Sequence, residues 1–281
     1  MLELRLRPEE KASLRLRSLY ESHGYSFYRM SRFEEYDFYA DKKDFLTSKR
    51  ILAFTDINGK LMALRPDVTL SIIKHIKDSQ SFQKFYYDEK VYRVPKNADS
   101  FREISQAGIE CVGGLGRENI AEVLELALMS LETIAEGRKF VLDVAHAGVV
   151  AELLKDNPEK MKILKCIAEK NLHGLKALDA PEKIIAMMEN DGKNFDVLDH
   201  DTIEIINSVK NHRDAIKIDF SAVSNLNYYN GIVFRGFIEG IPESILSGGQ
   251  YDGLMKSMNR QNSKALGFAV YLDLVRGGRN D

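Results

Sequence analysis

The sequence predicts an α+β domain in which a mostly antiparallel β-sheet is flanked by helices. The expected order of elements is a helix, a group of antiparallel strands, a helix, more strands, a helical segment, further strands and a last helix. Strands that follow one another around short polar turns favour antiparallel pairing. No Gly-x-Gly-x-x-Gly or P-loop pattern opens a helix, which argues against a dinucleotide or Walker nucleotide site.

The N-terminal part is expected to hold two helices and two strand pairs. Pro8 suits the first position of a helix that ends before Gly24. Asn58-Gly59 is the turn signal of a hairpin. The other expectations are a mostly extended, aromatic-rich stretch at 25–40, hairpin strands within 50–66, a helix at 67–79, and strands at 82–94 and 102–114 around a polar loop.

The C-terminal part begins with the clearest helix, at 117–137, whose apolar side chains recur at helical spacing. A buried-type strand follows at 139–147. Residues 148–212 show several short helical patterns interrupted by Pro158, Pro181 and Gly192, and are expected to form a helical insertion. The remaining expectations are strands at 215–223, 231–240 and 243–249, a short segment at 250–258, and a helix at 265–275.

Composition narrows the classes of protein. The 281 residues carry a net charge of −2 with both signs mixed along the chain, so no basic face for nucleic acid is indicated. No apolar stretch approaches the roughly 18 residues of a membrane helix, and the charged N-terminus lacks the apolar core of a secretory signal. We therefore expect a cytoplasmic protein, with no membrane and no nucleic-acid partner. Cys111 and Cys166 stand in no CxxC spacing and are expected to be reduced, and no metal or cofactor is predicted.

Four segments together resemble the catalytic core of histidyl-tRNA synthetase, a class II aminoacyl-tRNA synthetase. They are LRPDVT at 64–69, the strand pair at 86–94 and 102–114, LNYYNGIVF at 226–234 with SGGQYDGL at 247–254, and ALGFAVYL at 265–272. In that family they read LRPEGT, a motif 2 hairpin, an RGLDYY segment with a GGRYD turn, and a motif 3 helix. The resemblance spans about residues 8–275. It implies one synthetase-like core domain over 1–281, with 148–212 inserted in it and no anticodon-binding domain.

Departures from the family pattern bear on activity. The family's catalytic arginine corresponds to Ser224, and the motif 3 arginine corresponds to Leu274. Motif 2 keeps Arg93 but loses its acidic residue, and Ser31 stands where motif 1 usually has proline. Adenylation builds negative charge that fixed guanidinium groups stabilise, and loss of one such group costs a factor of about 10² or more. Amino-acid activation is therefore expected to be very poor, and no catalytic residue is assigned.

More of the family's residues are retained on the side of the pocket that binds the amino acid than on the side that binds ATP. By resemblance, Asp67 and Thr69 would receive the α-amino group of histidine, and Arg93 would meet its carboxylate. Gln106 and Glu110 lie four apart on a strand and so face the same side. The other residues that the resemblance places around histidine are Tyr228, Tyr229, Gly248, Gly249 and Tyr251.

A pocket that holds histidine without using ATP indicates a sensor. The regulatory subunits of ATP phosphoribosyltransferase are similar to the synthetase core and carry LRPDxT, as here. Membership of that family would imply a short-form catalytic subunit as partner, histidine as feedback effector, and a homodimer within a hetero-oligomer. Two alternatives stay open: a synthetase paralogue that activates an amino acid for a non-tRNA acceptor, and a module that binds tRNA or another partner. Taken alone, each segment also has an ordinary reading; Asp67, for example, suits the first turn of a helix.

Overall fold

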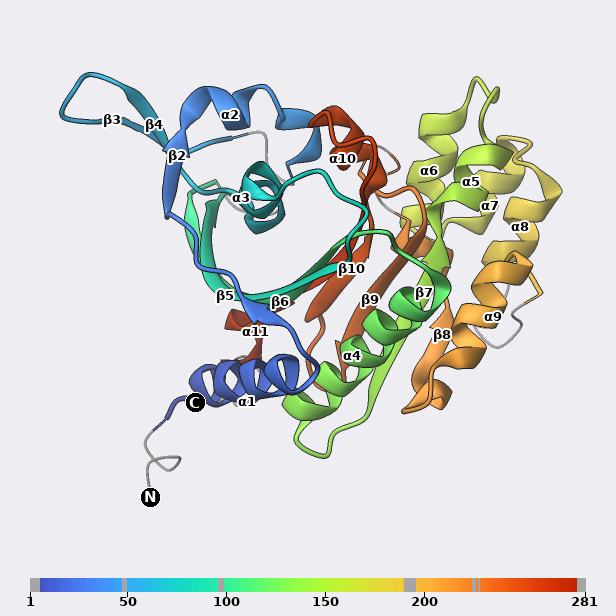
Figure 1. Ribbon diagram of the computed structural model, residues 1–281. Coiled ribbons are helices and arrows are strands. Elements are labelled where there is room, and N and C mark those ends of the chain that lie inside the picture. Colours follow the sequence, from blue (N-terminus) through green and yellow to red (C-terminus); the bar gives the residue numbers. More distant parts are fainter. Residues whose placement is uncertain are drawn as a thin grey trace.

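A computed structural model describes residues 6–46, 50–95, 99–189, 196–223, 226 and 228–276. Its centre is an eight-stranded mixed sheet (Figure 1). The β1–β5 and β7–β8 pairs are parallel and the other neighbouring pairs in this sheet are antiparallel, which confirms the predicted class. The strands, in the order of their neighbours, are β1 (Ser26–Phe27), β5 (Gln83–Arg93), β6 (Arg102–Gly113), β11 (Lys264–Tyr271), β10 (Leu246–Gln250), β9 (Ile232–Ile238), β7 (Phe140–His146) and β8 (Ile216–Ile218).

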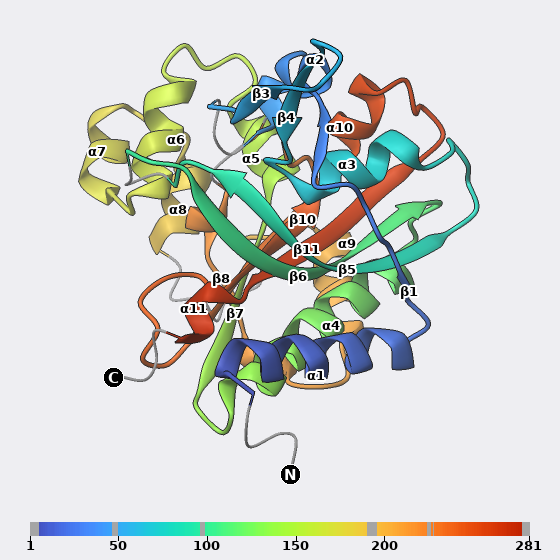
Figure 2. The ribbon, with the colours of Figure 1, turned by 90° about the vertical axis from the view of Figure 1, so that its left-hand side faces the viewer.

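Helices cover both faces of the curved sheet (Figure 2). The helices α1 (Pro8–Ser22) and α4 (Arg117–Ala135) lie against one face, where the apolar stripe of α4 enters the larger hydrophobic core. Such a stripe buries itself because the removal of apolar surface from water is the main force of folding. The opposite face is covered by α2 (Tyr36–Ala40), α3 (Val68–His75) and α10 (Asp252–Ser257), around a second, smaller core.

The short helices predicted for residues 148–212 are confirmed in the described part of this segment. Five helices lie together beside β7 and β8, at one end of the sheet (Figure 1). Gly192, which helped to predict the interruptions, falls outside the described residues. The helices are α5 (Ala147–Leu153), α6 (Lys160–Ala168), α7 (Leu172–Ala177), α8 (Glu182–Glu189) and α9 (His200–Ser208).

Three expectations about secondary structure were wrong. The strand expected at 215–223 is limited to β8, and Phe220–Ala222 form a short 3-10 helix, η4. Residues 265–275 are not a helix: β11 occupies most of the segment, and α11 (Asp273–Arg276) is a single turn. β11 lies between β6 and β10 and is buried on both faces, so its sequence lacks the alternation that identifies a half-exposed strand. The stretch at 25–40 is only partly extended, because α2 follows β2 (Phe33–Glu35).

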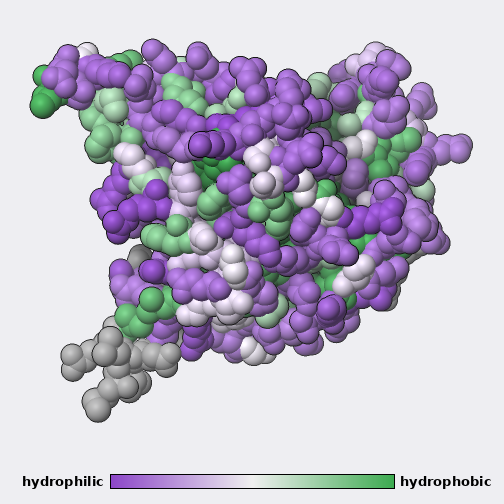
Figure 3. All heavy atoms as spheres, in the orientation of Figure 1, coloured by the Kyte–Doolittle hydropathy of each residue, from purple (hydrophilic) through white to green (hydrophobic). Residues whose placement is uncertain are grey.

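The predicted hairpin is confirmed as β3 (Ala53–Thr55) and β4 (Leu61–Leu64), which form a small sheet with β2. In its turn, Gly59 takes a positive φ of 79°, and the Asp56 carboxylate accepts hydrogen bonds from the amides of Asn58 and Lys60, both at 2.8 Å. Figure 3 shows hydrophobic residues near the tip of this hairpin, where Ile57 and Leu61 are exposed, on a face that is otherwise largely hydrophilic.

The hairpin is joined to the main sheet by Arg65, whose side chain is fully buried. Its guanidinium donates to the Ser31 carbonyl at 2.6 Å, to the Lys90 carbonyl at 2.8 Å and to the Glu89 carboxylate at 2.7 Å. The arginine of the LRPD segment therefore has a structural role: it fixes the chain that leads into α3.

Cys111 is buried, Cys166 is partly buried, and both are free thiols. No helix in the described part of the chain has both the length and the apolarity that a membrane crossing requires.

Substitution of Arg65 should destabilise the protein strongly. Arg65→Gln leaves the Glu89 carboxylate and two carbonyl groups without their buried donor, and breaking a buried ion pair costs about 3–5 kcal/mol. Denaturant unfolding monitored by circular dichroism measures the change. The control is Lys176→Gln, which removes the exposed ion pair with Glu189 and should cost less than about 1 kcal/mol. Equal losses in the two variants would contradict the assigned role.

Candidate ligand-binding site

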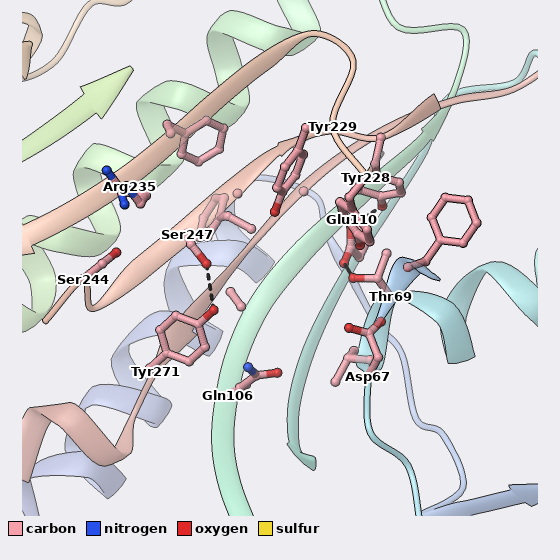
Figure 4. Close-up of a pocket in the computed structure, with 18 of the residues that line it drawn as sticks. Asp67, Thr69, Gln106, Glu110, Tyr228, Tyr229, Arg235, Ser244, Ser247 and Tyr271 are labelled. Carbon is pink, nitrogen blue, oxygen red and sulfur yellow. Dashed lines mark hydrogen bonds between the residues drawn. The ribbon is translucent and has the colours of Figure 1, made fainter. Parts of the chain in front are cut away.

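A cavity of about 500 Å³ lies between the sheet and the layer of helices above it (Figure 4). This volume is within the range of about 300–1,000 Å³ that is common for small-molecule sites. The strands β5, β6, β11, β10 and β9 contribute its floor, and α3, residues 228–229 and Tyr251 close it from above. Its lining mixes carboxyl, guanidinium, hydroxyl and aromatic groups, so the cavity suits a small polar ligand that carries charges of both signs.

Glycine makes room at the centre of the floor. Gly267 of β11 lies opposite Glu110 of β6 on one side and Gly249 of β10 on the other. A Cβ atom on Gly267 would lie 2.0 Å from Glu110 Oε2, and one on Gly249 would lie 2.8 Å from the ring of Tyr229. Because these two glycines have no side chain, the Glu110 carboxyl can lie over Gly267 and the Tyr229 ring can lie over Gly249.

Glu110 is the central polar group at one end of the cavity. It is 2% exposed, and its carboxyl accepts hydrogen bonds from Thr69 Oγ1 at 2.5 Å and from the hydroxyl of Tyr251. Burial raises the pKa of Glu110 to about 8; nearby Asp67 adds to the rise, and the two hydrogen bonds oppose it. At pH 7 the carboxyl is therefore largely protonated, and it can donate as well as accept a hydrogen bond.

Asp67 joins the same end from the N-terminus of α3. Its Oδ1 atom accepts the amide of Leu70 at 2.9 Å, so the residue is a helix cap as well as part of the cavity wall. Burial raises the pKa of Asp67, and the nearby guanidinium of Arg93 opposes that rise. The ordinary reading of Asp67 as a first-turn helix charge is thus compatible with a place in the site.

Three tyrosine rings cover this end. The centroids of Tyr228 and Tyr229 are 4.7 Å apart at an angle of 71°, and those of Tyr228 and Tyr251 are 5.7 Å apart. Burial raises the pKa of Tyr251 well above its usual value, so its hydroxyl stays protonated and donates to Glu110. The rings provide an apolar wall with polar tips, suited to a planar polar group such as an imidazole.

Nine of the ten predicted site residues line this one cavity: Asp67, Thr69, Arg93, Gln106, Glu110, Tyr228, Tyr229, Gly248 and Tyr251. The tenth, Gly249, lies beneath the Tyr229 ring and does not border the space itself. Their assignment to histidine stays a prediction. Among the described residues, no group of three or more His, Cys, Asp or Glu side chains could hold a metal ion.

Two departures from the family pattern concern the positions of its arginines, Ser224 and Leu274. Ser224 is outside the described residues. Leu274, in α11, is partly buried against the larger hydrophobic core and does not line the cavity.

The sequence reasoning missed the other end of the cavity. Arg235, Ser244, Ser247 and Tyr271 line it, and Tyr271 and Ser247 share a hydrogen bond of 2.7 Å between their hydroxyl oxygens (Figure 4). These residues are brought together by strand register, since Ser247 of β10 pairs with Arg235 of β9. The sequence indicated only that Arg235 lies in a strand. Which residues it faces depends on the pairing of that strand with β10.

Comparison with known proteins agrees with this architecture. A family model described as histidyl-tRNA synthetase matches residues 1–275. An ATP phosphoribosyltransferase regulatory subunit from Caldanaerobacter subterraneus subsp. tengcongensis is 30% identical over 93% of this chain and 76% of its own. Two solved structures, each 19% identical, share the fold. One is an ATP phosphoribosyltransferase regulatory subunit/histidyl-tRNA synthetase from Bacillus halodurans, with a TM-score of 0.78 over 98% of this chain and 79% of that one. The other belongs to an ATP phosphoribosyl transferase (HisG:HisZ) complex from Thermotoga maritima, with a TM-score of 0.72 over 92% of this chain and 96% of that one.

The raised pKa of Glu110 predicts a pH dependence of stability. The folded state holds this proton up to about pH 8, whereas the unfolded state releases it near pH 4.5. Between these pH values the folded state binds more protons than the unfolded state. The protonated Glu110 therefore contributes to the free energy of unfolding in full below about pH 4.5, and this contribution is lost as the pH rises toward 8. Glu110→Gln should lack this component. The measurement is the unfolding free energy of both proteins from pH 4.5 to 8.5, and a difference that stays constant across that range would contradict the raised pKa.

Proposed function

The chain belongs to the histidyl-tRNA synthetase family, and we propose that it is the regulatory, non-catalytic subunit of an ATP phosphoribosyltransferase in histidine biosynthesis. In this proposal residues 1–281 form one synthetase-like core with the helical insertion inside it. The chain binds histidine, and the transfer of a ribosyl phosphate to ATP belongs to the partner subunit.

The observation that carries the proposal is a contrast between two parts of the synthetase pattern. The residues that would hold an amino acid are gathered in one cavity, where Glu110 is held by Thr69 and Tyr251. The position of the motif 3 arginine is taken by Leu274, which is partly buried against the larger hydrophobic core. A leucine supplies no charge for the phosphates of ATP, so a protein built in this way can bind an amino acid but is poorly equipped to activate it.

Histidine fits the chemistry of the Glu110 end. The carboxylate of Asp67 suits an ammonium group, and the protonated Glu110 offers both a donor and an acceptor to an imidazole. Tyr228, Tyr229 and Tyr251 supply the ring faces. Feedback then follows if histidine binds one state of the assembly more tightly than another, because an effector shifts an equilibrium by its difference in affinity.

The proposed partner is a short-form catalytic subunit, with histidine as its inhibitor and this chain as a homodimer within a hetero-oligomer. The similarity to a regulatory subunit at 30% identity supports this choice. We place the homodimer contact at α1 and the segment after it, by resemblance to the class II synthetases. We further propose a cytoplasmic location, where the substrates of amino-acid biosynthesis are found.

Loss of charge at Asp67 should weaken feedback while subunit assembly continues. Asp67→Asn keeps a side-chain oxygen to cap α3 but removes the partner of the ammonium group. We expect the concentration of histidine that halves activity of the complex to rise about tenfold or more. Tyr229→Ala should act in the same direction.

The matched control is Asp214→Asn, at an exposed position in the turn before β8. Co-purification with the catalytic subunit reports assembly separately from inhibition. If histidine inhibits the complexes of Asp67→Asn and Tyr229→Ala as it inhibits the wild-type complex, histidine does not bind in this cavity.

An amino-acid-activating paralogue is the second candidate. Its specific support is that two guanidinium groups, of Arg93 and Arg235, do line the cavity. ATP–pyrophosphate exchange in the presence of histidine distinguishes the two functions. We expect a rate at background, since Leu274 supplies no cation; exchange at the rate of a genuine synthetase measured in parallel would eliminate the regulatory proposal in its non-catalytic form.

A further inference from the structure

The end of the cavity away from Glu110 is rich in hydrogen-bond donors. We call it the Arg235 end and define it by Arg235, Ser247, Tyr271 and Gln106 (Figure 4). The residues follow one another across the sheet: Arg235 pairs with Ser247, the Ser247 and Tyr271 hydroxyls share a hydrogen bond, and Tyr271 pairs with Gln106. None of them except Gln106 belongs to the site that the family pattern predicts.

Most of the bonding capacity of Arg235 is unused. Its Nη2 atom donates to Ser221 Oγ at 2.9 Å, which uses one of five N–H groups. The Nε atom is buried and has no hydrogen-bond partner among the described residues. An arginine donor buried in this way costs free energy unless a further group accepts a hydrogen bond from it.

The charge of Arg235 is also not balanced by a direct ion pair. In the described part of the chain no carboxylate lies within 4 Å of its guanidinium. Asp143, opposite Arg235 on β7, is the nearest candidate by register. Its carboxyl is hydrogen-bonded to Asp219, which in turn binds Lys170. Burial raises the pKa of Asp143, and the charges of Lys170 and Arg235 both act to lower it. Arg235 nevertheless makes no direct ion pair with a described residue, so its unused N–H groups remain available to a ligand.

The neighbouring groups can complete a receptor for oxygen atoms. Between the hydroxyls of Ser247 and Tyr271 one hydrogen is used by their mutual bond, and the other is left to donate. The side-chain amide of Gln106 makes no hydrogen bond to the described residues and supplies two further donors. One fixed cation beside neutral donors, with no carboxylate among the described residues that line this end of the cavity, matches an oxyanion.

We propose that Arg235 binds an oxyanion in this cavity. The oxyanion is a carboxylate or a phosphate, and it has two possible sources: the carboxylate of the bound amino acid itself, or a separate phosphate-bearing molecule next to it. The first source rests on the proposed function. Arg93, the cation that the family pattern assigns to the carboxylate, lies close enough to Asp67 to oppose the rise of its pKa, so its charge already faces an acid.

Calorimetric titration of the full chain, alone and in complex with its catalytic partner, tests this proposal. The ligands are histidine, histidinol, which replaces the carboxylate with a hydroxymethyl group, and inorganic phosphate. The variants are Arg235→Gln, which removes the charge, and Arg235→Lys, which keeps the charge without the planar donor fork. Arg213→Gln, at an exposed position outside the cavity, is the matched control. Thermal melting establishes that each variant is folded.

If the oxyanion is the carboxylate of the amino acid, Arg235→Gln weakens histidine binding about tenfold or more and leaves histidinol binding within about twofold. If the oxyanion is separate, phosphate binds the wild-type chain and the Arg213→Gln variant, and Arg235→Gln abolishes that binding. Arg235→Lys should fall between the wild type and Arg235→Gln in either case.

The proposal is overturned if Arg235→Gln binds histidine, histidinol and phosphate as the wild type does. Should the wild-type chain bind no histidine, the amino-acid site of the proposed function fails, and phosphate alone decides the role of Arg235. Phosphate binding that depends on Arg235 then supports the inference, and its absence overturns it.

Discussion

The site depends on the hydrogen bonds that the buried carboxyl of Glu110 accepts. Through hydrogen bonds from Thr69 and Tyr251 this carboxyl joins β6 to α3 and to the chain that enters α10, across a floor that Gly267 leaves open. A buried carboxyl without these partners would be costly, and a side chain at residue 267 would displace it. The layer of helices above the sheet is therefore held at the distance that leaves a cavity of about 500 Å³.

The cavity is polar at both ends, but the chemistry of the ends differs. Asp67 and the protonated Glu110 suit an ammonium or imidazole group, whereas Arg235 and the hydroxyls of Ser247 and Tyr271 suit oxygen acceptors. An amino acid with a polar ring carries complementary groups for both ends. Gly248 and Gly267, which line the cavity, leave room for such a ligand to lie against the sheet.

In the proposed function, a change from catalysis to sensing needs few substitutions on this fold. In that proposal Leu274, at the position of the motif 3 arginine, is partly buried against the larger core and supplies no charge. Binding and activation of the amino acid depend on separate groups, because the phosphates of ATP require fixed charge whereas the side chain of the amino acid requires shape and hydrogen bonds. One set can be lost without the other.

The sequence by itself determined the local elements and most of the Glu110 end. Pro8, Asn58-Gly59 and the apolar stripe of α4 are local signals, and the family pattern named nine residues that share the cavity. Only the tertiary structure decided that 265–271 is a central strand, because a strand buried on both faces shows no alternation. It likewise placed Arg235 beside Ser247 and Tyr271, since the register of β9, β10 and β11 is set by contacts between residues far apart in the chain.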